Sequence, residues 1–408
     1  MTAQSSTAVS PALTAFDPTT SHSSSAATTV PSSPTDDKSN PFTFLTPAAL
    51  PDIADSDEES LRELERRVRE GQGRAVETWG HRGASAAFRE YFFAFACTYL
   101  LKLIHVTHYV AENTLASFAK ACQDGADGIE TDIHMTADDR LVMFHDPELS
   151  RTTDGEGKIH ELPWEGVIEN VRTLEAPHQP VPLLSEVLAL LMRPENIHVK
   201  LNIDCKVEND PVRLFPMIKA ELEKFDHWQT LLAPRIILGV WHSAYASLHP
   251  EQPKFIEPAQ QHLPFLPRYA ICMSIPTVRE YFFTSCHGFS MYFPTLISAE
   301  GVAFRAECAR RGKKVAVWTV NKEEEMKECL RWGVQAVITD NPDITVGLVD
   351  KVKQDPTALL SSYLQQLVLP WSSIKYYSLS HAYEAKLERD YLEREGGTFD
   401  DVAITERS

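Results

Sequence analysis

The sequence is poor in positive charge and has no large basic cluster. Its 39 Lys and Arg stand against 57 Asp and Glu, which gives a formal charge of −18 at neutral pH. Nucleic acids and anionic membranes both select for clustered Lys and Arg. The short basic run at 310–314 fits the solvent-facing end of a helix. We therefore expect neither a nucleic-acid partner nor non-specific adhesion to anionic membranes.

Paired cysteines and a secretory leader are also missing. The seven Cys are scattered, odd in number and contain no C-x-x-C pair. They fit neither a zinc ribbon nor a disulfide framework. The start of the chain has no basic residues followed by an apolar stretch, so no secretory signal is expected. These absences favour a reducing compartment. The expected location is cytoplasmic, with peripheral contact to a membrane or lipid-droplet surface left open and the oligomeric state not indicated.

What the sequence does have is enough apolar material for one large domain. Of its 408 residues 43% are hydrophobic and 24% charged, as in ordinary globular proteins. Residues 1–56 are rich in Ser, Thr, Ala and Pro and are predicted to be a disordered tail. Residues 57–350 are predicted to form the globular domain, opened by a short amphipathic helix. Residues 351–408 are predicted to be a helical C-terminal extension.

Within the domain, short β-rich apolar runs alternate with helical patterns. Eight parallel-strand candidates give the count of a closed (β/α)₈ TIM barrel, with a doubly wound open sheet as the rival fold. A ninth run, Leu141–His145, follows its predecessor too closely for a parallel crossover and is assigned to a hairpin at the barrel mouth. Strands are expected at Glu77–Arg82, Gly128–His134, His198–Asp204, Arg235–Trp241, Tyr269–Ile275, Phe289–Phe293, Lys314–Val320 and Ala336–Thr339. Helices are expected at Asn113–Asp124, Leu183–Met192, Pro211–His227, Ser298–Arg311 and Lys322–Trp332.

Two acids in one expected strand are the strongest chemical signal. Glu130 and Asp132 are two residues apart, so in a strand they point to the same side and can reach one hard cation. Asp204 and Lys206 repeat this spacing at the end of the next parallel strand, and His145 follows the run assigned to the hairpin. In a TIM barrel the C-terminal ends of the strands meet at one mouth. We therefore expect these side chains to lie together.

An ordered series of motifs carries a family resemblance. It runs through His81–Ala84, Glu112–Phe118, Gly125–Asp132, His145–Pro147, Leu149–Thr153, Asp204–Lys206, Trp318–Asn321 and Ile338–Pro342. Over about residues 77–345 the chain is similar to the glycerophosphodiester phosphodiesterase family. The order of the motifs is more specific than any one of them alone.

The resemblance implies a phosphodiester hydrolase on a TIM barrel that uses a divalent cation. Oxygen ligands favour Mg²⁺ or Ca²⁺, with Mn²⁺ also suitable, over zinc. A cation with Arg and Lys would stabilise charge on the phosphoryl oxygens, while two His would move protons. Carried over residue by residue, the resemblance implies His81 and His145 as the acid/base pair, Glu130, Asp132 and Asp204 as metal ligands, and Arg82 and Lys206 as phosphate clamps, with Trp241 and Trp318 either a wall for the substrate or barrel packing.

Asp204 departs from the family, which generally has Glu at this position. Asp is used by related sphingomyelinase D enzymes and by fungal phosphatidylglycerol phospholipase C members, and residues 201–211 are most similar to the latter. The resemblance thus implies a phospholipase C-like reaction on phosphatidylglycerol that gives diacylglycerol and glycerol phosphate. Deacylated glycerophosphodiesters are the alternative substrates, and a phospholipase D-type reaction that forms a cyclic phosphate is the alternative chemistry.

Residues 89–111 interrupt the resemblance with an apolar, aromatic insertion, and Ala111 stands where relatives have Pro. Three interpretations stay open. A membrane span is long enough, but both of its flanks must return to the same barrel mouth. A lid could dip into a lipid surface. A translated intron would serve no function, and the chain would then be a catalytically disabled lipid- or phosphate-binding barrel.

Other polar residues have ordinary structural explanations. His134, His242 and His287 are expected to be surface or structural residues rather than catalytic ones. Glu112 is expected to brace the first loop, and Asn113 is expected to cap the helix that follows.

Overall fold

The structure is a computed structural model that describes residues 58–70, 75–85, 111–176, 178–241, 255–359, 378–397 and 399. Several predictions fall outside these residues: the N-terminal tail, residues 89–110 of the insertion, His242 and most of the apolar stretch that follows residue 359. The division of the chain into residues 1–56, 57–350 and 351–408 stays a prediction.

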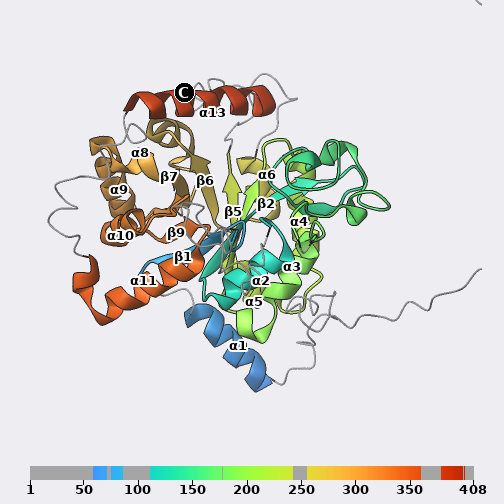
Figure 1. Cartoon of the computed structure of the whole chain (residues 1–408), viewed down its shortest axis with the longest axis horizontal. Coiled ribbons are helices and arrows are strands. Elements are labelled where there is room, and N and C mark those ends of the chain that lie inside the picture. Colours follow the sequence, from blue (N-terminus) through green and yellow to red (C-terminus); the bar gives the residue numbers. More distant parts are fainter. Residues whose placement is uncertain are drawn as a thin grey trace, which may run out of the picture. The chain divides into compact units, whose positions relative to one another are not determined.

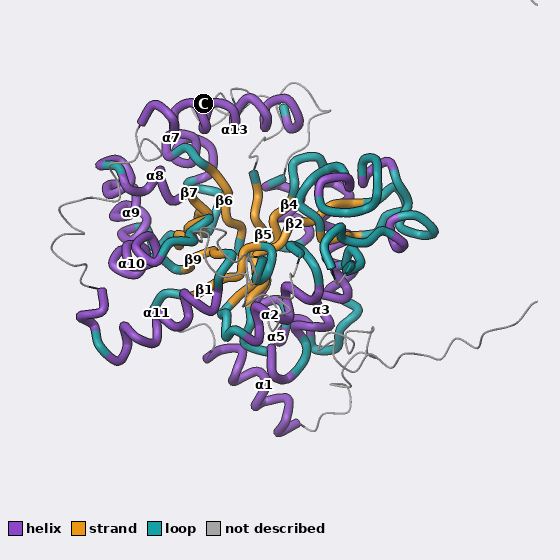
Figure 2. The backbone as a smooth tube through the Cα atoms, in the orientation of Figure 1, coloured by secondary structure: helices purple, strands orange, loops and turns teal. Residues whose placement is uncertain are grey.

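The centre of the molecule is a closed parallel barrel, drawn as arrows in Figure 1 and in orange in Figure 2. Strand β1 is hydrogen-bonded to both β2 and β9, so the sheet returns on itself. This confirms the predicted TIM barrel and excludes the doubly wound open sheet. The parallel strands are β1 (Glu77–His81), β2 (Gly128–Met135), β4 (Lys200–Cys205), β5 (Ile236–Val240), β6 (Arg268–Cys272), β7 (Gly288–Tyr292), β8 (Lys314–Trp318) and β9 (Ala336–Thr339).

The ninth strand is the expected hairpin. Strand β3 (Leu141–Met143) runs antiparallel to the end of β2, with Ile133 opposite Met143. The connecting turn is closed by the amide of Thr136, which donates to the carbonyl of Arg140 at 2.9 Å. The hairpin therefore extends β2 beyond the barrel and carries the chain on to His145 at the mouth.

The helices between the strands cover the barrel, and most follow the predicted pattern. One prediction is wrong in its end: α4 stops at Leu222 rather than at His227. His227 instead precedes α5, where it takes a left-handed conformation with φ of 56°. The two crossovers without a helical pattern contain the short α6, and α7 followed by a π-helical turn at Val278–Phe282. The helices of the barrel are α2 (Leu115–Gln123), α3 (Leu184–Leu191), α4 (Pro211–Leu222), α5 (Trp228–Leu231), α6 (Ile256–His262), α7 (Ile275–Thr277), α8 (Phe293–Ile297), α9 (Ala299–Arg310), α10 (Glu323–Trp332) and α11 (Pro342–Gln354).

Two further helices flank the barrel sequence. Helix α1 (Glu58–Glu70) buries Leu64 and Val68, as expected of the amphipathic opening helix. Helix α13 (Ser378–Gly396) forms the end of the described chain and agrees with the helical extension that was predicted. Among the helices of the described ranges, none has the length and apolar character needed to cross a bilayer.

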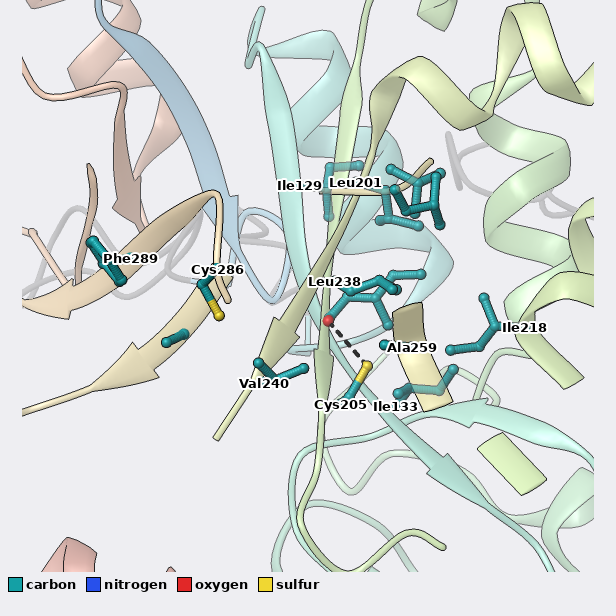
Figure 3. Close-up of a cluster of buried hydrophobic side chains, with 14 of the residues drawn as sticks. Ile129, Ile133, Leu201, Cys205, Ile218, Leu238, Val240, Ala259, Cys286 and Phe289 are labelled. Atoms are coloured by element: carbon teal, nitrogen blue, oxygen red, sulfur yellow. Dashed lines mark hydrogen bonds between the residues drawn. The ribbon is translucent and has the colours of Figure 1, made fainter. Parts of the chain in front are cut away.

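The outer face of the barrel is apolar because alternate strand residues point toward the helices. Figure 3 shows Ile129 and Ile133 of β2, with Leu201 of β4, on this face. They belong to one buried cluster with Ile218 of α4 and Ala259 of α6. Burial of such side chains contributes about 1.5–3 kcal/mol each, which holds the strands in register.

The other strand residues point into the barrel and form layers. An apolar layer at mid-height consists of Trp79, Ile237, Tyr269, Ala316, Ala336 and Ile338. A Cβ atom at Gly128 would lie 2.6 Å from the Trp79 ring, so only glycine leaves room for that indole. Toward the start of the strands, the Lys200 ammonium pairs with Glu77 at 2.5 Å. The residues nearest the strand ends therefore face the mouth above a closed apolar floor.

Candidate active site

All nine residues predicted for the site line one cavity at the barrel mouth. This catalytic pocket has a volume of about 90 Å³. Its floor includes Ile338 of the apolar layer, and its walls come from the C-terminal ends of the strands, as the TIM-barrel rule requires. The nine residues are His81, Arg82, Glu130, Asp132, His145, Asp204, Lys206, Trp241 and Trp318.

Three buried carboxylates form the centre of the catalytic pocket. Glu130 and Asp132 lie on β2, and Asp204 lies on β4 directly opposite Asp132 in the register. One oxygen from each lies within 4.8 Å of the other two. Burial and the charges of its two neighbours raise the pKa of Glu130 to about 7. Burial likewise raises the pKa of Asp204 to about 6, against the opposing charge of Lys206. A cluster of this kind stores repulsion that a bound cation relieves.

Two cations face the carboxylates from opposite sides. The Lys206 ammonium lies 2.7 Å from Asp132 and 2.8 Å from Asp204. The Arg82 Nε atom lies 3.5 Å from the other oxygen of Asp132. These two charges overcome the effect of burial and hold the pKa of Asp132 well below its usual range. Asp132 is therefore ionised, and the two cations are held at the edge of the pocket.

The turn after β1 positions Arg82 through its backbone. Arg82 takes a left-handed conformation with φ of 51°, and its amide donates to Glu130 at 3.0 Å. Gly83 follows with φ of 85°, and a Cβ atom there would lie 2.5 Å from the Ser117 hydroxyl. Such backbone strain persists only where the surroundings fix it. The turn thus ties a carboxylate of the cluster to the start of α2.

His81 is held by an acid that was not assigned a role from the sequence. Its Nδ1 lies 2.6 Å from Asp340, which also accepts from Ser85 at 2.8 Å and from Asn321 at 2.5 Å. Its Nε2 lies 4.0 Å from Glu130. Burial opposes protonation of His81, but the bond to Asp340 and the nearby acids outweigh it and raise the pKa of His81. Asp340 directly follows β9, so the strand-end rule could have found it.

His145 is held in the same way but has the opposite electrostatic setting. Its Nδ1 lies 2.6 Å from Asp146, which Arg151 binds in turn. Burial and the charge of Lys206 lower the pKa of His145, although Asp146 opposes them. Asp146 neighbours His145 in a quoted motif, yet adjacency alone did not indicate its role. Both imidazoles are therefore oriented by a carboxylate at Nδ1, but their pKa values are shifted in opposite directions.

Glu112 and Asn113 link the second motif to the site. Glu112 accepts from Arg82 at 3.1 Å and from Arg151 at 2.5 Å, as expected of a brace. The prediction that Asn113 caps α2 is wrong, because Thr114 is the N-cap. The Asn113 amide instead donates to Asp132 at 2.8 Å. It can do so because it takes a left-handed conformation with φ of 54°, which Asn tolerates.

The two tryptophans line the catalytic pocket and also take part in packing. Trp241 donates its indole N–H to Asp204 at 2.6 Å, and Trp318 donates to the carbonyl of Ser290 at 2.9 Å. Their rings lie 6.1 Å apart, edge to face. Trp241 thus holds an acid of the cluster, whereas Trp318 closes the apolar layer from above.

Two of the remaining histidines have structural contacts, as expected. His134 is buried and lies 3.2 Å from the carbonyl of His145, and burial lowers its pKa. His287 precedes β7, at the end of the barrel away from the mouth, and accepts from the amide of Arg268 at 3.2 Å. Neither lines the catalytic pocket.

Asn202 is a pocket residue that sequence reasoning missed. It is 1% exposed, and neither its amide nitrogen nor its oxygen has a hydrogen-bond partner among the described residues. Burial of such a group without a partner is costly. The i, i+2 rule that placed Asp204 and Lys206 on one face places Asn202 there too, so the signal was present.

The donor set fits a hard divalent cation. Three carboxylates from two adjacent strands offer oxygen ligands only, which is the choice of Mg²⁺, Ca²⁺ or Mn²⁺ rather than zinc. Burial, together with the neighbouring acids, raises the pKa values of Glu130 and Asp204, and a bound cation would favour their ionised forms. The uncommitted amide of Asn202 lies in the same cavity. The residues present therefore suit a metal ion, whose identity they leave open.

The comparisons with known proteins agree with this geometry. Residues 81–344 match the model of the glycerophosphoryl diester phosphodiesterase family, which is more than half of the chain. The chain belongs to this family, as its motifs predicted, and is an enzyme of the phosphodiesterase class.

Individual relatives are distant but cover the barrel. A glycerophosphodiester phosphodiesterase of Caldanaerobacter subterraneus subsp. tengcongensis is 28% identical over 269 residues, which is 59% of this chain and 93% of the relative. The lysophospholipase D GDPD1 of Rattus norvegicus is 24% identical over 265 residues, 57% of this chain and 79% of the relative.

Solved structures share the fold. An Oleispira antarctica phosphodiesterase in complex with the product sn-glycerol-3-phosphate has a TM-score of 0.52 at 22% identity, covering 67% of this chain and 96% of that one. A glycerophosphoryl diester phosphodiesterase structure from Silicibacter pomeroyi has a TM-score of 0.54 at 19% identity, covering 70% and 97%.

Proposed function

We propose that this chain hydrolyses glycerophosphodiesters with a divalent cation held by Glu130, Asp132 and Asp204. The observation that carries the proposal is the meeting of three buried acids, two cations and two carboxylate-bound imidazoles in one pocket. When bound, the cation would supply positive charge to the phosphoryl oxygens as the transition state forms. Arg82 and Lys206 would bind the same oxygens from the pocket edge.

His81 and His145 are the proposed proton carriers. Each has its Nδ1 on a carboxylate, so its Nε2 is the atom left for the substrate. His145, with its lowered pKa, suits the base that takes a proton from the attacking hydroxyl. His81, with its raised pKa, suits the acid that protonates the leaving alkoxide. The bond from phosphorus to the attacking oxygen forms as the bond to the leaving oxygen breaks. His145 gains a proton and His81 loses one, and proton exchange with water resets the pair.

The preferred substrate is phosphatidylglycerol, cleaved to diacylglycerol and glycerol phosphate, with deacylated glycerophosphodiesters as the alternative. The support is the similarity of residues 201–211, including Asp204, to the fungal phospholipase C members. Purified protein should be incubated with both substrates, with and without chelator. His81→Ala and Glu130→Ala serve as inactive controls. Release of diacylglycerol at the same rate with and without chelator would refute the metal-dependent mechanism.

A phospholipase D-type reaction is the second candidate. Asp204 is shared with the sphingomyelinase D resemblance, and a rat relative is named a lysophospholipase D. In that reaction a neighbouring hydroxyl of the substrate attacks phosphorus and leaves a cyclic phosphate. Phosphorus NMR of the first product separates a cyclic ester from an open monoester. A cyclic product that persists would replace the phospholipase C assignment.

A further inference from the structure

Helix α13 lies outside the matched family segment and crosses the barrel mouth. The family match ends at residue 344, whereas α13 begins at Ser378. Glu388 accepts the amide of Met273, just after β6, at 2.9 Å. One turn further on, Tyr391 donates to Glu208, which follows β4. The helix therefore spans the strand ends from β4 to β6, and Figure 1 shows it at the rim of the barrel.

The docking of α13 is anchored by buried side chains beyond these two bonds. Leu392 is 3% exposed and belongs to the main core cluster. Phe399, just past the helix, is 1% exposed; its ring lies 5.1 Å from that of Tyr281 in a tilted arrangement and 6.4 Å from that of Phe282, edge to face. Burial of such side chains stabilises the docked helix by about 1.5–3 kcal/mol each.

A second cavity lies between α13 and the mouth. Its volume is about 380 Å³, against about 90 Å³ for the catalytic pocket, and falls in the range of small-molecule sites. Three catalytic-pocket residues, His145, Lys206 and Trp241, also line this second cavity, which we call the α13 pocket. The two cavities therefore adjoin at the place where a scissile phosphate would meet His145.

The lining of the α13 pocket is mostly apolar. Pro147 and Val207 come from the barrel mouth, while Leu387 and Leu392 come from α13. Most of its polar side chains have partners: one oxygen of Glu208 binds Tyr391, Glu388 binds backbone and Lys206 pairs with the acid cluster. The second oxygen of Glu208 is buried without a partner among the described residues. The apolar part of this lining suits hydrocarbon, and the carboxylate of Glu208 disfavours a second phosphate there.

We propose that the α13 pocket binds the hydrocarbon chain of a glycerophosphodiester whose phosphate lies in the catalytic pocket. The inference rests on the proposed hydrolysis and deepens it by naming the part of the substrate that α13 recognises. A chain attached next to the scissile phosphate would leave the catalytic pocket past His145 and Trp241. A volume of 380 Å³ fits one chain, so the second chain of a diacyl lipid would extend outside.

The test compares short, water-soluble substrates with and without a chain. Glycerophosphoglycerol carries no chain, 1-octanoyl lysophosphatidylglycerol carries one and dioctanoyl phosphatidylglycerol carries two. Each buried methylene adds about fourfold in affinity, so the wild type should favour the one-chain over the chain-free substrate by at least about tenfold in kcat/KM. Leu387→Glu, which puts a charge into the lining, should reduce this ratio about tenfold. Tyr383→Glu is the matched control, because Tyr383 is exposed on the same helix and does not line the pocket.

The outcomes separate the two proposals. If the ratio of kcat/KM for the one-chain and chain-free substrates is equal in wild type, Leu387→Glu and Tyr383→Glu, the α13 pocket does not bind the chain. The proposed hydrolysis would be unaffected by that result. Octyl phosphate, which carries a chain and no scissile diester, gives an independent reading by calorimetry. Weaker binding by Leu387→Glu than by Tyr383→Glu supports the pocket even if no diester is cleaved, and equal binding overturns it. A wild-type preference for two chains over one would reject the single-chain assignment.

Discussion

The two ends of the barrel interior treat buried charge in opposite ways. Toward the start of the strands, Lys200 meets Glu77 at 2.5 Å, and the indole of Trp79 donates to the same carboxylate at 2.9 Å. At the mouth, three acids compete for two nearby cations, and the amide of Asn202 has no partner among the described residues. The paired charges of Lys200 and Glu77 stabilise the fold. The excess of acids at the mouth and the amide of Asn202 favour the binding of a ligand.

The largest effect is expected at the mouth, from Glu130→Gln. Loss of one acid of the cluster should lower kcat/KM by about 10³-fold or more, since it removes a proposed metal ligand. The same change should stabilise the metal-free protein above pH 7. The pKa of Glu130 is about 7 in the folded protein and lower in the unfolded chain. The folded protein therefore loses stability as the pH rises from the ordinary carboxyl pKa through 7. Steady-state kinetics and thermal unfolding in chelator measure the two effects. A destabilised variant would show that Glu130 is structural.

The matching change at the other end is Lys200→Met. It should cost about 3–5 kcal/mol of unfolding free energy, because Glu77 would keep a buried charge without its counter-ion. Urea denaturation measures the loss, and the double change Glu77→Gln with Lys200→Met should restore most of it. Protein that remains folded should keep its kcat. A large fall in kcat of Lys200→Met at unchanged stability would contradict the view that this end of the barrel serves the fold and the mouth serves catalysis.

A smaller effect is expected from Asp340→Asn. Asp340 has a pKa lowered to about 2, against the effect of burial, because it binds His81, Ser85 and Asn321. Its removal should lower the pKa of His81, so the alkaline limb of the kcat/KM profile should move to lower pH and the maximum should fall about 10- to 100-fold. The acidic limb, assigned to His145, should stay in place. Movement of that limb instead would exchange the two proton-transfer roles.

The smallest effect is expected at α13. Burial raises the pKa of Glu388 to about 8, so its contribution to helix docking is complete below the ordinary carboxyl pKa and is lost as pH rises through 8. Glu388→Gln should therefore protect the helix from proteolysis more at pH 8.5 than at pH 5. The rate of cleavage within 378–397 measures this. Equal protection at both pH values would mean that Glu388 is ionised in the docked helix.

Residues governed by strand position could be predicted from the sequence. Alternation and the strand-end rule placed Glu130, Asp132 and Asp204 together, and the short turn after β2 identified the hairpin. The same rules also reach Asn202 and Asp340, which stand in segments that carry the family resemblance but were given no role there. Strand position alone is therefore enough to place all five of these residues at the mouth.

Residues governed by contacts distant in sequence could not be predicted. Asn113 looks like a helix cap, and only its left-handed backbone turns its amide toward Asp132. The short helix α6 has few apolar positions and is stabilised by packing rather than by its own periodicity. The docking of α13 depends on Glu388 meeting a backbone amide more than a hundred residues earlier, which no periodicity encodes.

The hydrogen bonds around the Arg82 carbonyl have a consequence for how the length of the chain between residues 86 and 110 can change. The Arg82 carbonyl oxygen accepts from the backbone N–H of Asn113 at 3.0 Å and from the Ser117 hydroxyl at 2.9 Å. The strand end and the start of α2 are thus fastened to each other at the root of the connection. Evolution can lengthen or shorten the chain between 86 and 110 while the stem stays closed, since closure of a longer loop costs little extra entropy. A lineage could in this way acquire new recognition elements without moving one catalytic atom.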